Sequence, residues 1–152
     1  MLCLLTGLSS PAIAAPTSVQ SDLSSVPLAI MQPSEIQATI QAAIAAWTQG
    51  RAEEFANLFA EDGEFIVPGH RWVGPEAIRQ VTADFIQDHE ATISIQHILI
   101  QDQHAAIEWQ WQETNKSTGE NSQANDVIMI DFVDGKIQRW REYIDAQSQL
   151  AG

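Results

Sequence analysis

Hydrophobic residues follow a helical spacing in the first half of the chain. Ile36, Ile40 and Trp47 lie on one face of a helix that begins with Ser34 as a plausible cap and ends at Gly50. Phe55, Leu58 and Phe59 give a shorter helix its apolar face, and a proline at the first helical position marks the start of a third. The predicted elements after the first helix are a helix over 52–59, a brief strand over 64–67 and a helix from Pro75 to about His89.

Apolar and polar residues alternate in the second half of the chain, which predicts long antiparallel strands. The segments 91–101 and 104–114 form one pair, and a second pair flanks Asp134-Gly135. This dipeptide is the strongest hairpin signal in the chain, because glycine adopts a positive φ without steric cost. Three helices followed by four long strands indicate an α+β fold, in which a strongly curved sheet wraps a helix and encloses a conical pocket.

The register of the last hairpin decides the candidate chemistry. The final strand places Trp140 and Glu142 on the same face. A two-residue turn would put Val127 opposite Glu142 and leave that carboxyl alone among apolar groups. A three-residue loop with a glycine bulge would put Asp126 opposite Glu142, beside Ile128. Both geometries fit the sequence; we favour the second, in which apolar surroundings and a like charge raise a carboxyl pKa, as general acid–base catalysis requires.

Composition and charge narrow the function classes. The chain has 152 residues, enough for one domain with a real core. Its net charge is −13, and its seven basic residues are nowhere clustered, which argues against nucleic acid and anionic membrane surfaces as partners. No phosphate-binding loop or nucleophile motif is present, and four separated histidines without paired acidic spacing give no metal site. We therefore expect no metal and no cofactor.

The N-terminus resembles a cleaved export signal. Residues 1–14 contain an apolar run followed by Ala12-Ile13-Ala14, a small-residue cleavage pattern, and the run is too short to span a bilayer. No Lys or Arg precedes it, so either translation starts upstream or the segment is not a signal. Export predicts a periplasmic or secreted protein, and Cys3, the single cysteine, would leave with the leader. The remaining chain divides into a linker over 15–33, a domain over 34–147 and a tail over 148–152.

Three short motifs together resemble a known family. They are Leu58-Phe59-Ala60-Glu61-Asp62-Gly63-Glu64-Phe65, Gly74-Pro75-Glu76-Ala77-Ile78 and Trp140-Arg141-Glu142-Tyr143. Their order and spacing resemble the SnoaL-like branch of the nuclear-transport-factor-2-like (ketosteroid isomerase-like) superfamily. The resemblance implies a cone-shaped barrel, in which a curved antiparallel sheet wraps around N-terminal helices, and a homodimer through the open sheet face. Such proteins include cyclases, isomerases, epoxide hydrolases, dehydratases and non-catalytic binding modules, so the fold alone says little about chemistry.

The resemblance carries over only in part at the catalytic positions. Ketosteroid isomerases keep a base carboxylate before a proline after the first strand, where this chain has Val67. Limonene epoxide hydrolases carry Arg and Asp on the second long strand, where this chain has Trp109 and Trp111. Their second Asp corresponds to Glu142. A cyclase-type site with one acid–base carboxyl in an apolar pocket fits this pattern, whereas an isomerase or epoxide hydrolase of the known type does not.

The candidate site residues follow from these arguments. Glu142 is the acid–base candidate, with Asp126 or His70 assisting. The alternative is that Glu142 only forms an ion pair with Arg139 or another surface cation. His97 lies between apolar neighbours of an alternating strand and is expected to be a core or cavity histidine. Three hypotheses remain: an enzyme, a binding module for a small hydrophobic molecule, or a dimerising scaffold whose tryptophans fill the interior. The candidate ligand contacts are Trp47, Trp72, His97, Trp109, Trp111, Ile128 and Trp140.

Overall fold

The computed structural model describes residues 29–145. The segment predicted as a signal peptide, most of the linker and the C-terminal tail lie outside the described residues, and export stays a prediction. Within the described range, no helix combines the length and hydrophobicity that a membrane crossing requires. The elements, in chain order, are α1 (Pro33–Thr48), α2 (Ala52–Ala56), β1 (Phe59–Val67), β2 (His70–Val73), α3 (Pro75–Asp88), β3 (His89–Gln101), β4 (His104–Asn115), β5 (Asn121–Val133) and β6 (Lys136–Ile144).

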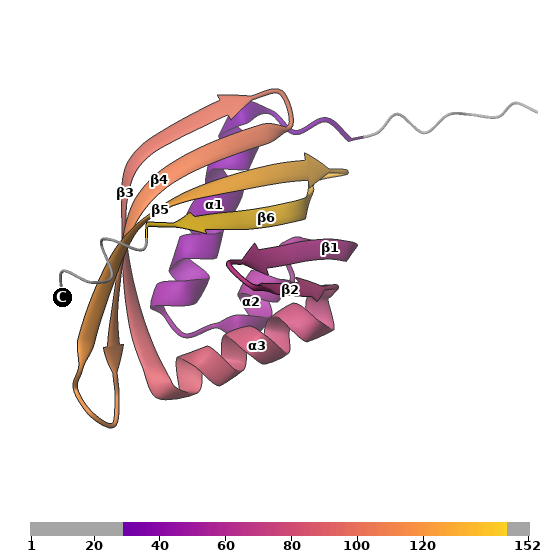
Figure 1. The fold of residues 1–152 in the computed structure, drawn as a ribbon. Coiled ribbons are helices and arrows are strands. Elements are labelled where there is room, and N and C mark those ends of the chain that lie inside the picture. The colour runs from indigo at the N-terminus through magenta and orange to yellow at the C-terminus, as the bar shows by residue number, and fades with distance from the viewer. Residues whose placement is uncertain (1–28, 146–152) are drawn as a thin grey trace, which may run out of the picture.

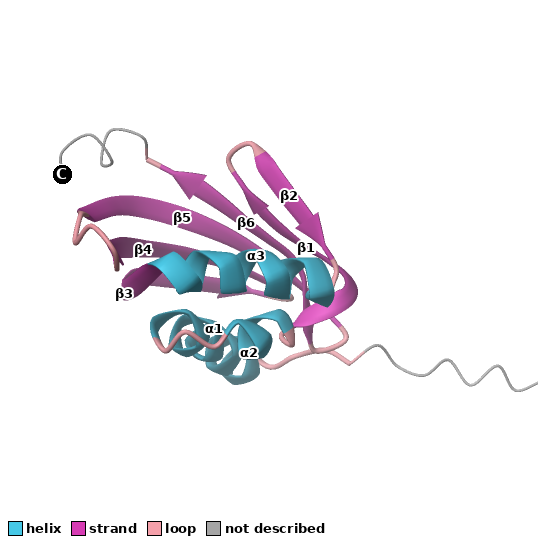
Figure 2. Cartoon of the chain, turned by 90° about the horizontal axis from the view of Figure 1, so that it is seen from below, coloured by secondary structure: helices cyan, strands magenta, loops and turns pink. Residues whose placement is uncertain are grey.

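The described strands form one curved sheet in the order β2-β1-β6-β5-β4-β3. The helices cover one face of it, and the sheet bends around α1 (Figures 1 and 2). The predicted α+β architecture is therefore confirmed. Two features differ from the expected antiparallel barrel: β1 pairs with β6 in parallel, and within the described range the sheet keeps two free edges, β2 and β3.

The local boundaries near the N-terminus shift for identifiable reasons. Gln32, and not Ser34, is the N-cap of α1, because the Gln32 and Glu35 side chains form a reciprocal capping box. α2 is shorter than predicted and β1 is longer, since Phe59 already pairs with Ile137 of β6. The backbone N–H of Ile137 donates to the carbonyl of Leu58 at 2.9 Å. Tertiary pairing with β6 thus overrides the helical pattern of this stretch.

A β-bulge in β3 reverses the predicted orientation of His97. The pairing with β4 shifts between Ile95 and His97, so the alternation of side chains slips by one residue. His97 points to the outer face, where its side chain is 77% exposed and its Nδ1 lies 2.7 Å from a carboxylate oxygen of Glu108. The prediction of a core or cavity histidine is wrong. Strict alternation cannot anticipate an inserted residue.

The last hairpin has the two-residue turn, one of the two geometries that the sequence left open, but its pairing changes farther along the strands. Val133 pairs with Lys136 across a two-residue turn, with positive φ at both Asp134 and Gly135, so the three-residue loop is wrong. A bulge then shifts the pairing just beyond Phe132. As a result Glu142 faces Ile128 rather than either predicted partner.

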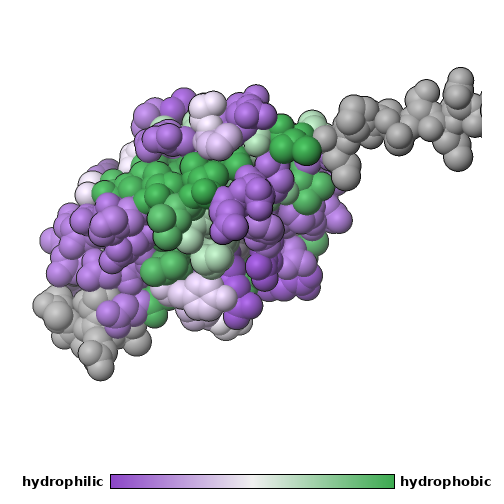
Figure 3. Space-filling model, turned by 90° about the horizontal axis from the view of Figure 1, so that it is seen from above, coloured by the Kyte–Doolittle hydropathy of each residue, from purple (hydrophilic) through white to green (hydrophobic). Residues whose placement is uncertain are grey.

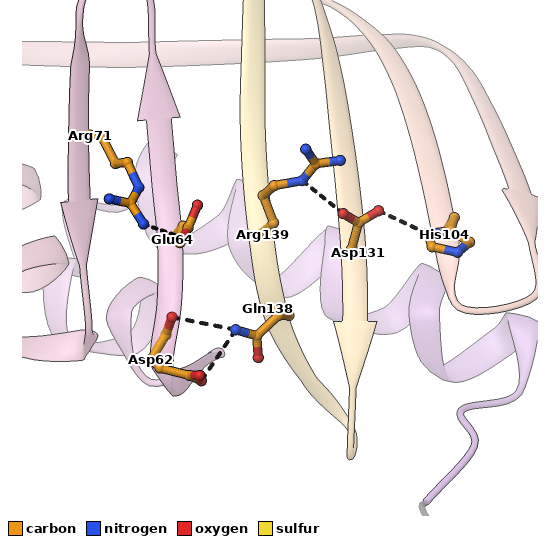
Figure 4. Close-up of polar contacts among 7 residues, drawn as sticks. All are labelled: Asp62, Glu64, Arg71, His104, Asp131, Gln138 and Arg139. Carbon is orange, nitrogen blue, oxygen red and sulfur yellow. Dashed lines mark hydrogen bonds and ion pairs between the residues drawn. The ribbon is translucent and has the colours of Figure 1, made fainter.

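The outer face of the sheet carries a row of charged residues at one end (Figure 4). Arg71 on β2 pairs with Glu64 on β1, and Asp131 on β5 lies 2.7 Å from Arg139 and 2.8 Å from His104. A hydrogen bond from Arg71 lowers the pKa of Glu64. Acidic and basic side chains thus alternate over five neighbouring strands. Because these pairs are largely solvated, each contributes little to stability.

Gly63 allows β1 to lie against β6. A Cβ added there would lie 2.8 Å from the carbonyl oxygen of Ile137 and 2.9 Å from that of Ala60, both backbone atoms. We expect Gly63→Ala to lower the free energy of unfolding by up to about 3 kcal/mol, because the backbone must shift. Urea denaturation followed by tryptophan fluorescence measures the change.

Gly69→Ala is the matched control. Gly69 has a φ of +83° with no atom within 4 Å of the added Cβ, so only backbone strain of about 1 kcal/mol opposes the substitution. Equal decreases in the free energy of unfolding of the two variants would contradict a steric role for Gly63.

Candidate functional site

A pocket of about 500 Å³ lies between the concave face of the sheet and the helices. Its walls are mainly aromatic and aliphatic side chains from α1, α3 and five strands. Carboxyl groups of β4, β5 and β6 are the main polar groups. The residues that line it are Trp47, Phe65, Val67, Trp72, Val81, Phe85, Trp111, Glu113, Ser122, Gln123, Ala124, Asp126, Glu142 and Ile144.

Asp126 is a buried carboxyl on β5. Only 4% of the residue is exposed. The indole N–H of Trp109 donates to its Oδ2 at 3.2 Å, whereas its Oδ1 has no hydrogen-bond partner among the described residues. Burial raises the pKa of Asp126, against the lowering effect of the Trp109 hydrogen bond, and the charge of Asp145 adds to the rise. Asp126 therefore lies in the interior of the domain.

Glu142 is the second carboxyl, on β6. It lines the pocket and is partly accessible. The indole N–H of Trp140 donates to its Oε1 at 2.9 Å. Burial raises the pKa of Glu142 to about 7; the Trp140 hydrogen bond opposes this rise and the nearby Asp126 charge adds to it. At neutral pH the group is therefore divided between its acid and its base forms.

The two carboxyls share one face through adjacent strand pairs. Asp126 lies opposite Ile144, and the next pair along the same face is Ile128 opposite Glu142. Asp126 and Glu142 are therefore diagonal neighbours rather than direct partners. The shared apolar face that we favoured from the sequence exists, although a bulge in the hairpin and not the predicted loop produces it.

Glu113 is a third pocket carboxyl, which the sequence reasoning missed. Trp111 donates its indole N–H to Glu113 at 2.9 Å, and the hydroxyl of Ser122 donates to it at 2.8 Å. A signal was present, since Trp111-x-Glu113 and Trp140-x-Glu142 repeat one pattern. Residues two apart on a strand share a face, so this spacing brings an indole N–H to a carboxylate.

The predicted ligand contacts separate into two layers. Trp47, Trp72 and Trp111 line the pocket. Three others, Trp109, Ile128 and Trp140, are fully buried and do not line it. We call this buried layer behind the carboxyls the floor of the pocket. Of the two predicted ligand contacts on β4, Trp111 thus lines the pocket and Trp109 does not.

His70 does not line this pocket. Its exposed ring stacks on Trp72 at 5.6 Å between ring centroids. It borders an adjoining depression, which also contains Arg71, Arg141 and Glu142. His70 and Glu142 therefore both border this second depression, but only Glu142 also lines the pocket. Among residues 29–145, no group of His, Cys, Asp and Glu gathers in a way that could hold a metal ion.

Residues 40–140 match the family model of the SnoaL-like domain. The chain belongs to the SnoaL-like domain family. A comparison with curated proteins gave no significant match.

Solved structures of low sequence identity share the fold. A protein of ketosteroid isomerase-like fold from Catenulispora acidiphila, in complex with trimethylamine, is 22% identical with a TM-score of 0.68, over 74% of this chain and 89% of that one. A LEH-like epoxide hydrolase of M. tuberculosis is 15% identical with a TM-score of 0.70, over 78% and 88%. An NTF2-like protein of Burkholderia xenovorans is 21% identical with a TM-score of 0.66, over 80% and 97%. These similarities establish the NTF2-like fold of the SnoaL-like domain.

The raised pKa of Glu142 makes stability depend on pH in an unusual direction. Its native pKa of about 7 exceeds the ordinary value of 4.5, so the native state keeps a proton that the unfolded chain has lost. We expect the free energy of unfolding to fall between about pH 4.5 and pH 7 and to level off above. Glu142→Gln removes this loss, so at pH 8 the variant should be more stable than the parent by on the order of 3 kcal/mol, and nearly equal to it at pH 4. Urea denaturation at both pH values measures the difference.

Trp140→Phe serves as the control variant. It removes the N–H donor that lowers the pKa of Glu142, so the carboxyl should titrate above the parent value of about 7. Carboxyl ¹³C NMR measures both titrations. A Glu142 that titrates near 4.5 in the native parent would contradict the assignment of a desolvated carboxyl.

Proposed function

We propose that this protein binds a small apolar organic molecule in the pocket and carries out general acid–base chemistry on it with Glu142. The observation that carries the proposal is the convergence of Glu142 and Asp126 in an apolar, aromatic-walled pocket of about 500 Å³, a volume typical of small-molecule sites. A carboxyl whose pKa lies near 7 is poised to accept or to donate a proton at neutral pH.

Glu142 and the groups next to it have different roles in this proposal. Glu142 takes a proton from one atom of the substrate and returns it to another, as an isomerisation, cyclisation or dehydration requires. Trp140 holds the carboxyl through its indole N–H and so fixes the direction of proton transfer. Asp126 disfavours the ionised form of Glu142 by its like charge and, through its free Oδ1, offers an acceptor to the substrate.

A second candidate function is binding of the same class of molecule without turnover. It is favoured by Trp109 and Trp111, which occupy the positions that the resemblance gives to an Arg and Asp catalytic pair. Trp109 donates to Asp126 and Trp111 to Glu113, so both indoles engage pocket carboxyls. In this alternative Glu142 orients a polar end of the ligand. The scaffold hypothesis is less well supported, because the tryptophans leave the interior open.

A base-promoted ring opening separates the two candidates without knowledge of the natural substrate. In nitrobenzisoxazole a base removes the carbon-bound hydrogen as the nitrogen–oxygen bond breaks, which gives a coloured cyanophenolate. If Glu142 is an accessible base in an apolar pocket, the protein should accelerate this reaction, with a rate that rises with pH through about 7. We expect Glu142→Gln to lower the rate by about a hundredfold or more.

Two further variants control the assay. Ala124→Leu adds bulk at a pocket-lining position of β5 and should also lower the rate. Val127→Leu adds similar bulk on the outer face of the same strand, where the side chain is exposed, and should leave the rate unchanged. Full activity of Glu142→Gln would eliminate the acid–base proposal and favour binding without turnover.

We also propose a homodimer through the outer face of the sheet. Leu99 on β3, Val127 on β5 and Tyr143 on β6 are exposed there by 72%, 41% and 50%. A band of hydrophobic residues also runs over the side of the molecule where β3 is the edge strand (Figure 3). Apolar area of this kind commonly marks an interface between subunits.

Leu99→Asp tests the dimer, because it places a charge at the most exposed of these apolar side chains. We expect the parent protein to sediment as a dimer and the variant as a monomer in analytical ultracentrifugation. Glu120→Asp, a conservative change at an exposed residue of the β4–β5 loop, should remain dimeric. A monomeric parent protein would refute this part of the proposal.

A further inference from the structure

The aromatic lining of the pocket gathers around its carboxyl groups. Five aromatic rings from five different elements contribute to the walls. The rings of Trp47 and Trp111 meet edge-on at 5.4 Å between centroids, and Trp72 stacks on Phe65 at 5.6 Å. The fifth ring is that of Phe85 on α3. The negative faces of such rings attract cations, most strongly when water is excluded.

The charges in the pocket are of one sign. Glu113, Asp126 and Glu142 line it, and none of the described residues that line it is basic. The basic residues of the adjoining depression have other contacts: Arg71 pairs with Glu64, and Arg141 lies over the Tyr143 ring at 5.1 Å. The negative potential inside is therefore not neutralised by a neighbouring cation of the described chain.

Two buried polar atoms of residues that line the pocket lack protein partners. Oδ1 of Asp126 is an acceptor without a donor, and the indole N–H of Trp47 is a donor without an acceptor, both among the described residues. Asp126 is 4% exposed and Trp47 6%. Buried groups of this kind are normally satisfied, so they point to a bound molecule that carries a cationic or donor group near Asp126 and an oxygen near Trp47.

We propose that the apolar molecule bound in this pocket carries an organic ammonium group, held by the aromatic walls and by the carboxylates of Asp126 and Glu142. This inference rests on the proposed function, because it assigns a ligand class to the same pocket. The aromatic rings contact the alkyl groups around the nitrogen, and the carboxylates supply the opposite charge. An anionic ligand is disfavoured by the same groups.

Choline and its uncharged isostere dimethylbutanol, in which carbon replaces the nitrogen, form a matched pair of probes. Both have the same shape and the same hydroxyl, so a difference in binding reports the charge alone. We expect choline to bind at least about tenfold more tightly at pH 8, as measured by isothermal titration calorimetry on the full-length protein. Asp126→Asn should abolish most of this preference while dimethylbutanol binding persists. Asp131→Asn, on the outer face of the same strand, should retain the preference.

The pH dependence provides a readout that does not rely on a variant. A bound cation favours ionised carboxylates, so choline, which keeps its charge at every pH, should bind more tightly as the pH rises through about 7. Binding of the neutral alcohol should show no such rise, and Glu142→Gln should flatten the choline curve. The titratable and charged groups that face or adjoin this site are Glu113, Asp126, Glu142, Asp145, His70, Arg71 and Arg141.

The outcomes distinguish this inference from the proposed function. Tighter binding of choline, lost in Asp126→Asn, supports the ammonium site. Equal or tighter binding of dimethylbutanol overturns the ammonium site but leaves an apolar ligand pocket in place. Failure of both probes to bind, together with a failed ring-opening assay, overturns the proposed function as well. A choline affinity that does not change between pH 5.5 and pH 8.5 would also refute the role given to the carboxylates.

Discussion

Desolvation of two carboxyl groups by an aromatic interior is the constraint on which the site depends. Asp126 and Glu142 lie among aromatic and aliphatic side chains, and each receives one indole N–H, from Trp109 and from Trp140. One hydrogen bond from an indole N–H stabilises a carboxylate much less than full hydration does. The pKa values therefore rise, and that of Glu142 reaches about 7. The tryptophans thus determine both the shape of the pocket and the acidity of its carboxyls.

The same arrangement connects the fold to the proposed function. A carboxyl that the core holds in a partly protonated state costs stability at neutral pH, which is common at sites that carry out chemistry. The outer side of the sheet differs, because its carboxylates, such as Glu64 and Asp131, pair with arginine side chains at the surface. One sheet therefore presents carboxylates in two electrostatic environments. The proposed proton transfer and the proposed binding of a cation both depend on the concave environment.

Two β-bulges decide which residues lie on the concave side of the sheet. The bulge in β3 turns His97 outward and brings Ile98 to the inner side, opposite Ile107. The bulge in the last hairpin brings Glu142 opposite Ile128 and so makes it a diagonal neighbour of Asp126. In each case a shift of one residue exchanges the faces or partners of the side chains that follow. Membership of the SnoaL-like family accounts for the overall shape, but such local shifts decide which side chains face the concave side.

The sequence by itself determined the α+β order, the positions of the long strands and the placement of Trp140 and Glu142 on one face, because these follow from side-chain periodicity and turn chemistry. It also carried the Trp-x-Glu spacing that places indoles beside carboxyls. Tertiary structure alone decided the parallel pairing of β1 with β6, the register of the last hairpin, the exclusion of His97 and the division of the tryptophans between pocket and floor. These depend on contacts between distant segments and on inserted residues, which leave no regular pattern along the chain.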